Sequence, residues 1–179
     1  MRILAATSLA LATLATPAFA QDADAPISGV HVTAIGGIDH VTDSGDSASG
    51  VLGGVIIGYD KQLSNIVIGG ELEASVSNTK YCSGAACVEA GRDLYAGARI
   101  GVPVGGRSMI YAKGGYTNAR IVGTVSGNTV TSDNVDGWRA GVGAETNVGK
   151  LVARVEYRYS DYDGGTKRHQ GLVGVGYRF

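Results

Sequence analysis

Two stretches of the chain combine a histidine with nearby acids, and one of them adds a serine. Their members are Asp39, His40 and Asp43, and Ser160, Asp161, Asp163 and His169. A base, an orienting carboxylate and a hydroxyl nucleophile are the parts that acyl transfer or hydrolysis needs. No motif fixes their spacing, however, and Asp, Ser and His are ordinary loop residues. The sequence therefore predicts no catalytic residues, and an enzyme stays an alternative.

The two cysteines, Cys82 and Cys87, are separated by Ser-Gly-Ala-Ala. A metal site would need further ligands, and no histidine or second cysteine pair lies near them. An even pair in an exported chain predicts a disulfide at the tip of a loop. The glycine pairs match neither Walker nor dinucleotide spacing, and the net charge of −1 argues against nucleic acid as a partner. We expect no metal and no cofactor.

The first twenty residues resemble an export signal. Arg2 precedes an apolar stretch, which ends in Pro17-Ala18-Phe19-Ala20. A secretory signal peptide typically has a basic start, a short apolar middle and small residues just before its cleavage site. We predict a signal peptide over residues 1–20 and a short periplasmic segment over 21–27.

From residue 28 onward, apolar or small residues alternate with polar ones, which is the period of a β-strand. The pattern predicts eight strands, at about 28–40, 50–60, 65–77, 90–103, 107–119, 134–147, 150–161 and 168–179. Each is close to the roughly 9 to 11 residues with which a tilted strand crosses a bilayer. After the signal peptide, no uncharged apolar run reaches the roughly 18 residues of a spanning helix.

Short and long connections alternate between these strands. Tight turns are expected around 60–65, 103–107 and 147–150, and mostly longer loops around 41–49, 78–89, 120–133 and 162–167. Short periplasmic turns and longer outward loops are typical of outer-membrane barrels. We therefore predict an all-β fold over residues 28–179: an eight-stranded, antiparallel, up-and-down transmembrane β-barrel with both ends on one side.

One face of the strands avoids charge and the other collects it. The predicted lumen charges are Glu71, Glu73, Arg99, Lys113, Arg139, Glu145, Arg154, Glu156, Arg158 and Arg178. Aromatic residues on the uncharged face stand at strand ends, as membrane interfaces favour: Tyr59, Tyr177 and Phe179 near the turns, and Tyr116, Trp138 and Tyr159 near the loops. A lumen this narrow holds only side chains, so each buried charge must be paired.

The last hairpin carries a family resemblance. Residues 154–162, Arg-Val-Glu-Tyr-Arg-Tyr-Ser-Asp-Tyr, and 171–179, Gly-Leu-Val-Gly-Val-Gly-Tyr-Arg-Phe, resemble the end of opacity-type, OmpA-like outer-membrane β-barrel proteins of Gram-negative bacteria. The resemblance implies an outer-membrane location. It also implies that Phe179, with Tyr177 two residues before it, is recognised by the outer-membrane assembly machinery. The first strand lacks the aromatic residues often seen there in relatives.

A filled barrel predicts no wide pore. We expect an envelope structural component, a surface-loop interaction or adhesion protein, or both, which contacts outer-membrane lipid as a monomer and binds a surface ligand not identified by the sequence. The predicted acidic outer rim comprises Asp39, Asp43, Asp46, Asp133, Asp136, Asp161 and Asp163. Three alternatives stay open: a small-solute porin-like channel, an outer-membrane enzyme at the extracellular rim, and a soluble lipocalin-like binding barrel with its charges outside.

Overall fold

The computed structural model describes residues 27–43, 46–83, 86–125 and 128–179. The predicted signal peptide and residues 21–26 lie outside this part of the chain. No helix in the described ranges is long and apolar enough to cross a membrane.

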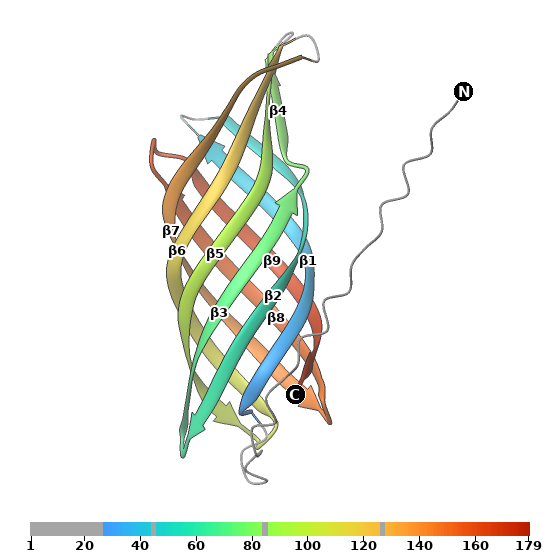
Figure 1. Cartoon of the computed structure of the whole chain (residues 1–179), viewed down its shortest axis with the longest axis vertical. Helices are drawn as coiled ribbons and strands as arrows, with labels where there is room; N and C mark the ends of the chain where they lie inside the picture. The colour runs from blue at the N-terminus through green and yellow to red at the C-terminus, as the bar shows by residue number, and fades with distance from the viewer. Residues whose placement is uncertain (1–26, 44–45, 84–85, 126–127) are drawn as a thin grey trace, which may run out of the picture.

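The described chain is a single antiparallel β-sheet that closes on itself (Figure 1). Its strands are β1 (Gly29–Asp43), β2 (Asp46–Leu63), β3 (Ile66–Ser77), β4 (Lys80–Ser83), β5 (Ala86–Val104), β6 (Ser108–Val125), β7 (Asn128–Val148), β8 (Leu151–Tyr162) and β9 (Lys167–Arg178). The order β3-β2-β1-β9-β8-β7-β6-β5 is closed by pairing between β3 and β5, and β4 is a short addition to the outer part of β5. The eight-stranded up-and-down barrel predicted from the sequence is confirmed.

Burial alternates along the strands, because successive side chains of a strand point to opposite faces of the sheet. In β8 the exposed positions include Leu151 and Val155, and the buried ones between them include Val152 and Arg154. The apolar side chains are thus largely on the outside, and the charged ones are inside. This is the reverse of a soluble barrel, so the lipocalin-like alternative is wrong.

The strands extend further outward than the sequence predicted. Residues 41–49, 78–89 and 120–133 were expected to be loops, but β1 runs to Asp43 and pairs there with Asp46 of β2. Likewise, β5 begins at Ala86, β6 ends at Val125, and β4 is an additional strand. Thr, Val and Ile recur in the longest of these segments, 120–133, and continued pairing satisfies backbone groups that a loop would leave to water.

The three tight turns fall where expected, and each contains a residue with positive φ that a reversal in so few residues requires. These are Ser64 (φ 52°) between β2 and β3, Gly105 and Gly106 (63° and 77°) between β5 and β6, and Gly149 (64°) between β7 and β8. The start of β1 and the end of β9 lie at the same end of the barrel, where the Arg178 amide donates to the Lys150 carbonyl at 2.8 Å. We refer to it as the turn end, and to the opposite end as the outer end.

Candidate functional site

The lumen is filled with charged side chains in equal numbers. Seven carboxylates and seven cations are buried there, each no more than 5% exposed: Asp39, Asp60, Glu71, Glu73, Asp93, Glu145 and Glu156, and Arg99, Lys113, Arg139, Arg154, Arg158, Arg168 and Arg178. Ions in so dry a space are tolerated only when they are paired. The pairs form three successive groups along the barrel.

The group at the turn end joins two arginines to two acids. Arg99 donates to both carboxylate oxygens of Asp60 and to Glu145 at 3.1 Å. Arg178 reaches the same two acids, at 2.8 Å to Asp60 and 2.5 Å to Glu145. Below them, an apolar cluster that includes Ile27 fills this end of the lumen. The turn end of the barrel is therefore occupied by side chains.

The central group is organised by Glu71, which forms ion pairs with Arg99 at 3.1 Å, Lys113 at 3.2 Å and Arg154 at 2.9 Å. Lys113 also pairs with Glu156 at 2.8 Å, and Arg154 with Glu145 at 2.8 Å. Two of these residues are thus shared with the turn-end group. The pairs form one network rather than separate bridges.

The outer group continues the network. Glu73 pairs with Arg158 at 2.5 Å and Arg139 at 3.5 Å, and Arg139 pairs with Asp93 at 2.6 Å. Arg168 then joins Asp93 to Asp39, with distances of 2.9 Å and 2.6 Å. Linked charges therefore extend along the lumen, and side chains occupy the route that a solute would take.

The structure places all ten predicted lumen residues in this network. Four further charged residues are buried in this network and were not among the ten predicted: Asp39, Asp60, Asp93 and Arg168. Asp39 was predicted on the acidic rim, but its carboxylate accepts hydrogen bonds from Arg168, Ser77 and Thr79. The sequence does indicate that these two aspartates point inward. Because alternate residues of a strand share a face, which we call strand parity, Asp39 lies on the face of Gly37 and Ile35, and Asp60 lies on the face of Gly58.

The residues of the predicted enzyme alternative do not come together. His40 and His169 are cross-strand partners, but His40 Nδ1 contacts the Ser49 hydroxyl at 2.8 Å, and His169 Nδ1 contacts the Tyr157 hydroxyl at 2.7 Å. Ser160 is fully buried and accepts a hydrogen bond from Arg139 at 2.8 Å. Since parity separates the exposed histidines from the buried Asp39 and Ser160, the described residues form no serine–histidine–carboxylate arrangement here. Nor do they contain a cluster of metal ligands.

The lipid-facing wall lies between two groups of aromatic side chains at its two ends. Tyr59, Tyr177 and Phe179 stand near the turn end, 46%, 40% and 47% exposed, and Tyr177 packs edge-on against Phe179 at 4.9 Å between ring centroids. Trp138 packs against Tyr159 toward the outer end, at 5.5 Å. We define the wall between these two groups as the membrane belt.

Beyond the belt, β5, β6 and β7 continue into a tall outer sheet, which Figure 1 shows above the other strands. Cys82 of β4 and Cys87 of β5 face each other directly and form a disulfide, with a Cα–Cα distance of 4.1 Å. On β7, Asp136 accepts hydrogen bonds from the Tyr116 hydroxyl and from Asn118, and these bonds hold the pKa of its carboxyl below the usual value. The side chains of Asp43 and Asp46 lie outside the described part.

Comparison with known proteins gives one family and several solved structures. The family described as "Outer membrane protein beta-barrel domain" matches residues 6–179. Similar solved structures include Ail, the attachment invasion locus protein of Yersinia pestis, at 18% identity over 86% of this chain and all of that chain, with a TM-score of 0.62. Ail was solved in complex with the heparin analogue sucrose octasulfate.

Two further structures share the fold. Neisserial surface protein A is 16% identical over 85% of this chain and 98% of its own, with a TM-score of 0.67. The N-terminal β-barrel domain of Pseudomonas aeruginosa OprF is 14% identical over 83% and 97%, with a TM-score of 0.52. Among curated protein sequences, none matches the chain significantly.

Proposed function

Because the chain belongs to the outer membrane protein β-barrel family, we propose that it is a sealed envelope barrel whose outer sheet binds an extracellular polypeptide. The family places the chain in the outer membrane. The observation that carries the finer proposal is a strand edge that no described strand pairs with, on a sheet that rises beyond the membrane belt.

The sealed lumen separates this proposal from a small-solute channel. A channel of this strand number would need a continuous wet path, whereas the axis holds linked ion pairs from Asp60 to Asp39. We expect no stable conductance steps when the full chain is reconstituted into planar bilayers. A reproducible open level would favour the channel instead.

The unpaired edge belongs to the outer part of β7. Residues 128–136 pair with β6, but pairing with β8 begins only at Gly137. The Asp136 carbonyl accepts a hydrogen bond from the Asp163 amide at 2.8 Å, on the side away from β6. Because alternate residues of a strand direct both backbone groups to the same side, Asn134 and Ser132 also present theirs to the open edge. An extended peptide can add a strand at such an edge.

The charge of the outer end favours a cationic partner. The sequence places seven acids there and four bases: Asp43, Asp46, Glu89, Asp133, Asp136, Asp161 and Asp163, and Lys80, Arg92, Arg120 and Lys167. Complementary charge guides encounter and selects partners. The sulfated ligand seen with Ail would be repelled by such a surface, so we propose a basic extended polypeptide for this chain.

A proline substitution tests the edge. Ser132→Pro removes an amide that faces the open side and leaves the hydrogen bonds to β6 intact. Ser132→Ala is the matched control, because it also loses the hydrogen bond from Arg120. Peptides from a random library that bind the full chain in nanodiscs should be rich in Lys and Arg, and should bind the Ala variant but not the Pro variant. Equal binding by both variants would refute the edge as the site.

We also propose that the C-terminal strand, ending in Tyr177 and Phe179, is recognised by the outer-membrane assembly machinery, and that the folded protein is a monomer without enzymatic activity. The exposed, mutually packed pair of rings supports the first point. In cells, Phe179→Ala should lower the fraction of chain that is folded in the outer membrane, while the purified variant still refolds into vesicles.

A further inference from the structure

A row of small residues crosses the membrane belt on the side of β3, β5, β6 and β7. Gly70, Ala98, Gly114 and Ala140 are successive cross-strand partners, so they lie side by side on the lipid-facing wall. With neighbouring strands about 4.8 Å apart, the row is about 14 Å long. Because the strands of such barrels tilt by about 45°, the row rises about 10 Å along the membrane normal, which fits within the roughly 15 Å depth of one leaflet.

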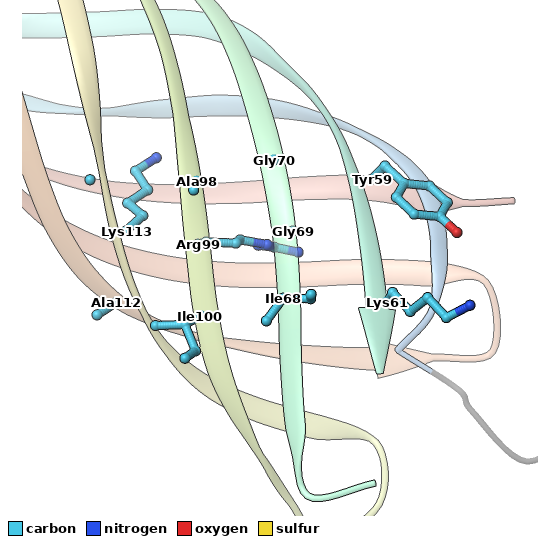
Figure 2. Close-up of a pocket in the computed structure, with 11 residues that line it drawn as sticks. Tyr59, Lys61, Ile68, Gly69, Gly70, Ala98, Arg99, Ile100, Ala112 and Lys113 are labelled. Atoms are coloured by element: carbon cyan, nitrogen blue, oxygen red, sulfur yellow. The ribbon is translucent and has the colours of Figure 1, made fainter. Parts of the chain in front are cut away.

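Larger side chains line both sides of this row. Toward the turn end stand Ile68 and Ile100, which are cross-strand partners and 44% and 54% exposed. On the other side stand Leu72 and Tyr116, 63% and 54% exposed. The row is therefore the floor of a groove, which we call the furrow. Its part over β2, β3, β5 and β6 is an open hollow of about 940 Å³, and Figure 2 shows the residues that line it.

The two glycines of the furrow are not required by the barrel itself. A Cβ at Gly70 would meet only the Gly97 carbonyl at 3.7 Å, and one at Gly114 only the Arg139 carbonyl at 3.8 Å, which are ordinary contacts. Neither residue has a positive φ. Glycine weakens a strand interior and often marks the close approach of another group. Here the free space beside both glycines is on the exposed, lipid-facing side of the wall.

One end of the furrow carries a cation. Lys61 of β2 is the cross-strand partner of Ile68, and its side chain is exposed beside Tyr59 (Figure 2). No ion pair within the described chain involves Lys61. It stands at the turn end, which an outer-membrane barrel directs to the periplasm. The furrow thus joins an apolar floor to a cation near the headgroup level of the periplasmic leaflet.

We propose that the furrow is a binding site for one phospholipid of the periplasmic leaflet. An acyl chain lies along Gly70, Ala98 and Gly114, between the isoleucines on one side and Leu72 on the other. The phosphodiester lies near Lys61, which attracts it as basic residues near a membrane surface attract anionic lipid. The hollow falls within the roughly 300 to 1,000 Å³ that is typical of sites for small ligands.

The test uses the full chain in nanodiscs made of equal parts phosphatidylethanolamine and phosphatidylglycerol. Native mass spectrometry of the released protein reports how much phosphatidylglycerol stays bound. Lys61→Gln should lower the retained lipid about fivefold, the factor that corresponds to one basic residue at a membrane surface. Lys150→Gln, at another turn of the same end, should leave it unchanged. Ala98→Leu should abolish retention, and Ala153→Leu, on the exposed lipid face of β8, should not.

The outcomes separate this lipid from other occupants. Equal retention by the native chain, Lys61→Gln and Ala98→Leu would overturn the proposal. So would stronger retention of lipid A than of phosphatidylglycerol in a second set of nanodiscs that contains both, since lipid A belongs to the other leaflet. Disulfide-linked dimers of Ala98→Cys in the nanodisc would assign the furrow to a second copy of the chain. If Ala98→Leu does not fold, the result for Lys61→Gln alone decides whether the proposal stands. That variant should fold, because the side chain of Lys61 is outside the lumen.

Discussion

Glu71→Gln removes one charge from the centre of the lumen with almost no change of shape. Glu71 is 3% exposed and lies within 3.2 Å of Arg99, Lys113 and Arg154. The substitution leaves six buried carboxylates for seven buried cations. Because the glutamine keeps the volume and some hydrogen bonding, the loss of stability reports on charge balance rather than on packing.

The expected cost is large compared with the stability of a small domain. Removing one partner of a buried ion pair costs about 3 to 5 kcal/mol, because the other charge stays buried without compensation. Glu71 has three cationic neighbours, but each of them has another acid within 4 Å. We therefore expect a value near the lower limit, about 3 kcal/mol. Native stabilities are only about 5 to 15 kcal/mol.

Urea unfolding in lipid vesicles measures this change, with the fluorescence of the single tryptophan, Trp138, as the signal. Asp163→Asn is the control, because this acid is exposed and outside the lumen; its cost should stay within about 0.5 kcal/mol. Glu71→Gln combined with Lys113→Gln restores equal numbers of charges. The double variant should therefore be more stable than the sum of the two single losses predicts.

Two results would refute the reasoning. If Glu71→Gln costs no more than Asp163→Asn, the lumen is wet enough to screen its charges. If the double variant loses the full sum of the single variants, Glu71 and Lys113 do not interact, and pairing is not what stabilises the lumen.

Three further predictions concern other parts of the barrel. Replacing Cys82 and Cys87 by serine should weaken the outer hairpin by about 2 kcal/mol, seen as faster amide exchange there with unchanged exchange in the belt. Gly143→Ala should cost about 1 to 3 kcal/mol in urea unfolding, because its Cβ would lie 2.6 Å from a buried tyrosine hydroxyl, whereas Gly70→Ala should be near neutral. The carboxyl of Asp136 has a pKa below the usual value of about 3.9. The hydrogen bonds that it accepts from Tyr116 and Asn118 should therefore stabilise the fold above about pH 3.9 and be lost as the pH falls through the lowered pKa. An NMR titration of Asp136 with a midpoint at or above about 3.9 would contradict this.

Strand parity carried most of what the sequence could predict. A two-residue period assigns each side chain to one of two faces, so Arg154 and Glu156 were placed inside before any pairing was known. The specific pairs could not be predicted, because they depend on register. Glu73 and Arg158 are 85 residues apart in sequence, and only the closed barrel brings them to 2.5 Å.

The errors arose where residue type was given more weight than parity. Asp39 was predicted among the acids of the outer rim, although its position in the alternation places it inside. The outer strands were missed for the same reason, since Ser, Thr, Asn and Asp in 120–133 are typical of turns. There the pairing of β6 with β7 overrides local preference, as strand propensity depends strongly on neighbours.

Glycine has two different uses in this chain, and the structure separates them. At inward positions such as Gly141, a Cβ would lie 3.2 Å from Arg158, so glycine makes room for long charged side chains. At outward positions such as Gly70 and Gly114, there is room for a side chain and none is present. The glycines of this chain therefore have two different causes, and the alternation along each strand separates them. Inward glycines leave room for the charged side chains of the lumen, and the outward glycines of the furrow leave room for lipid.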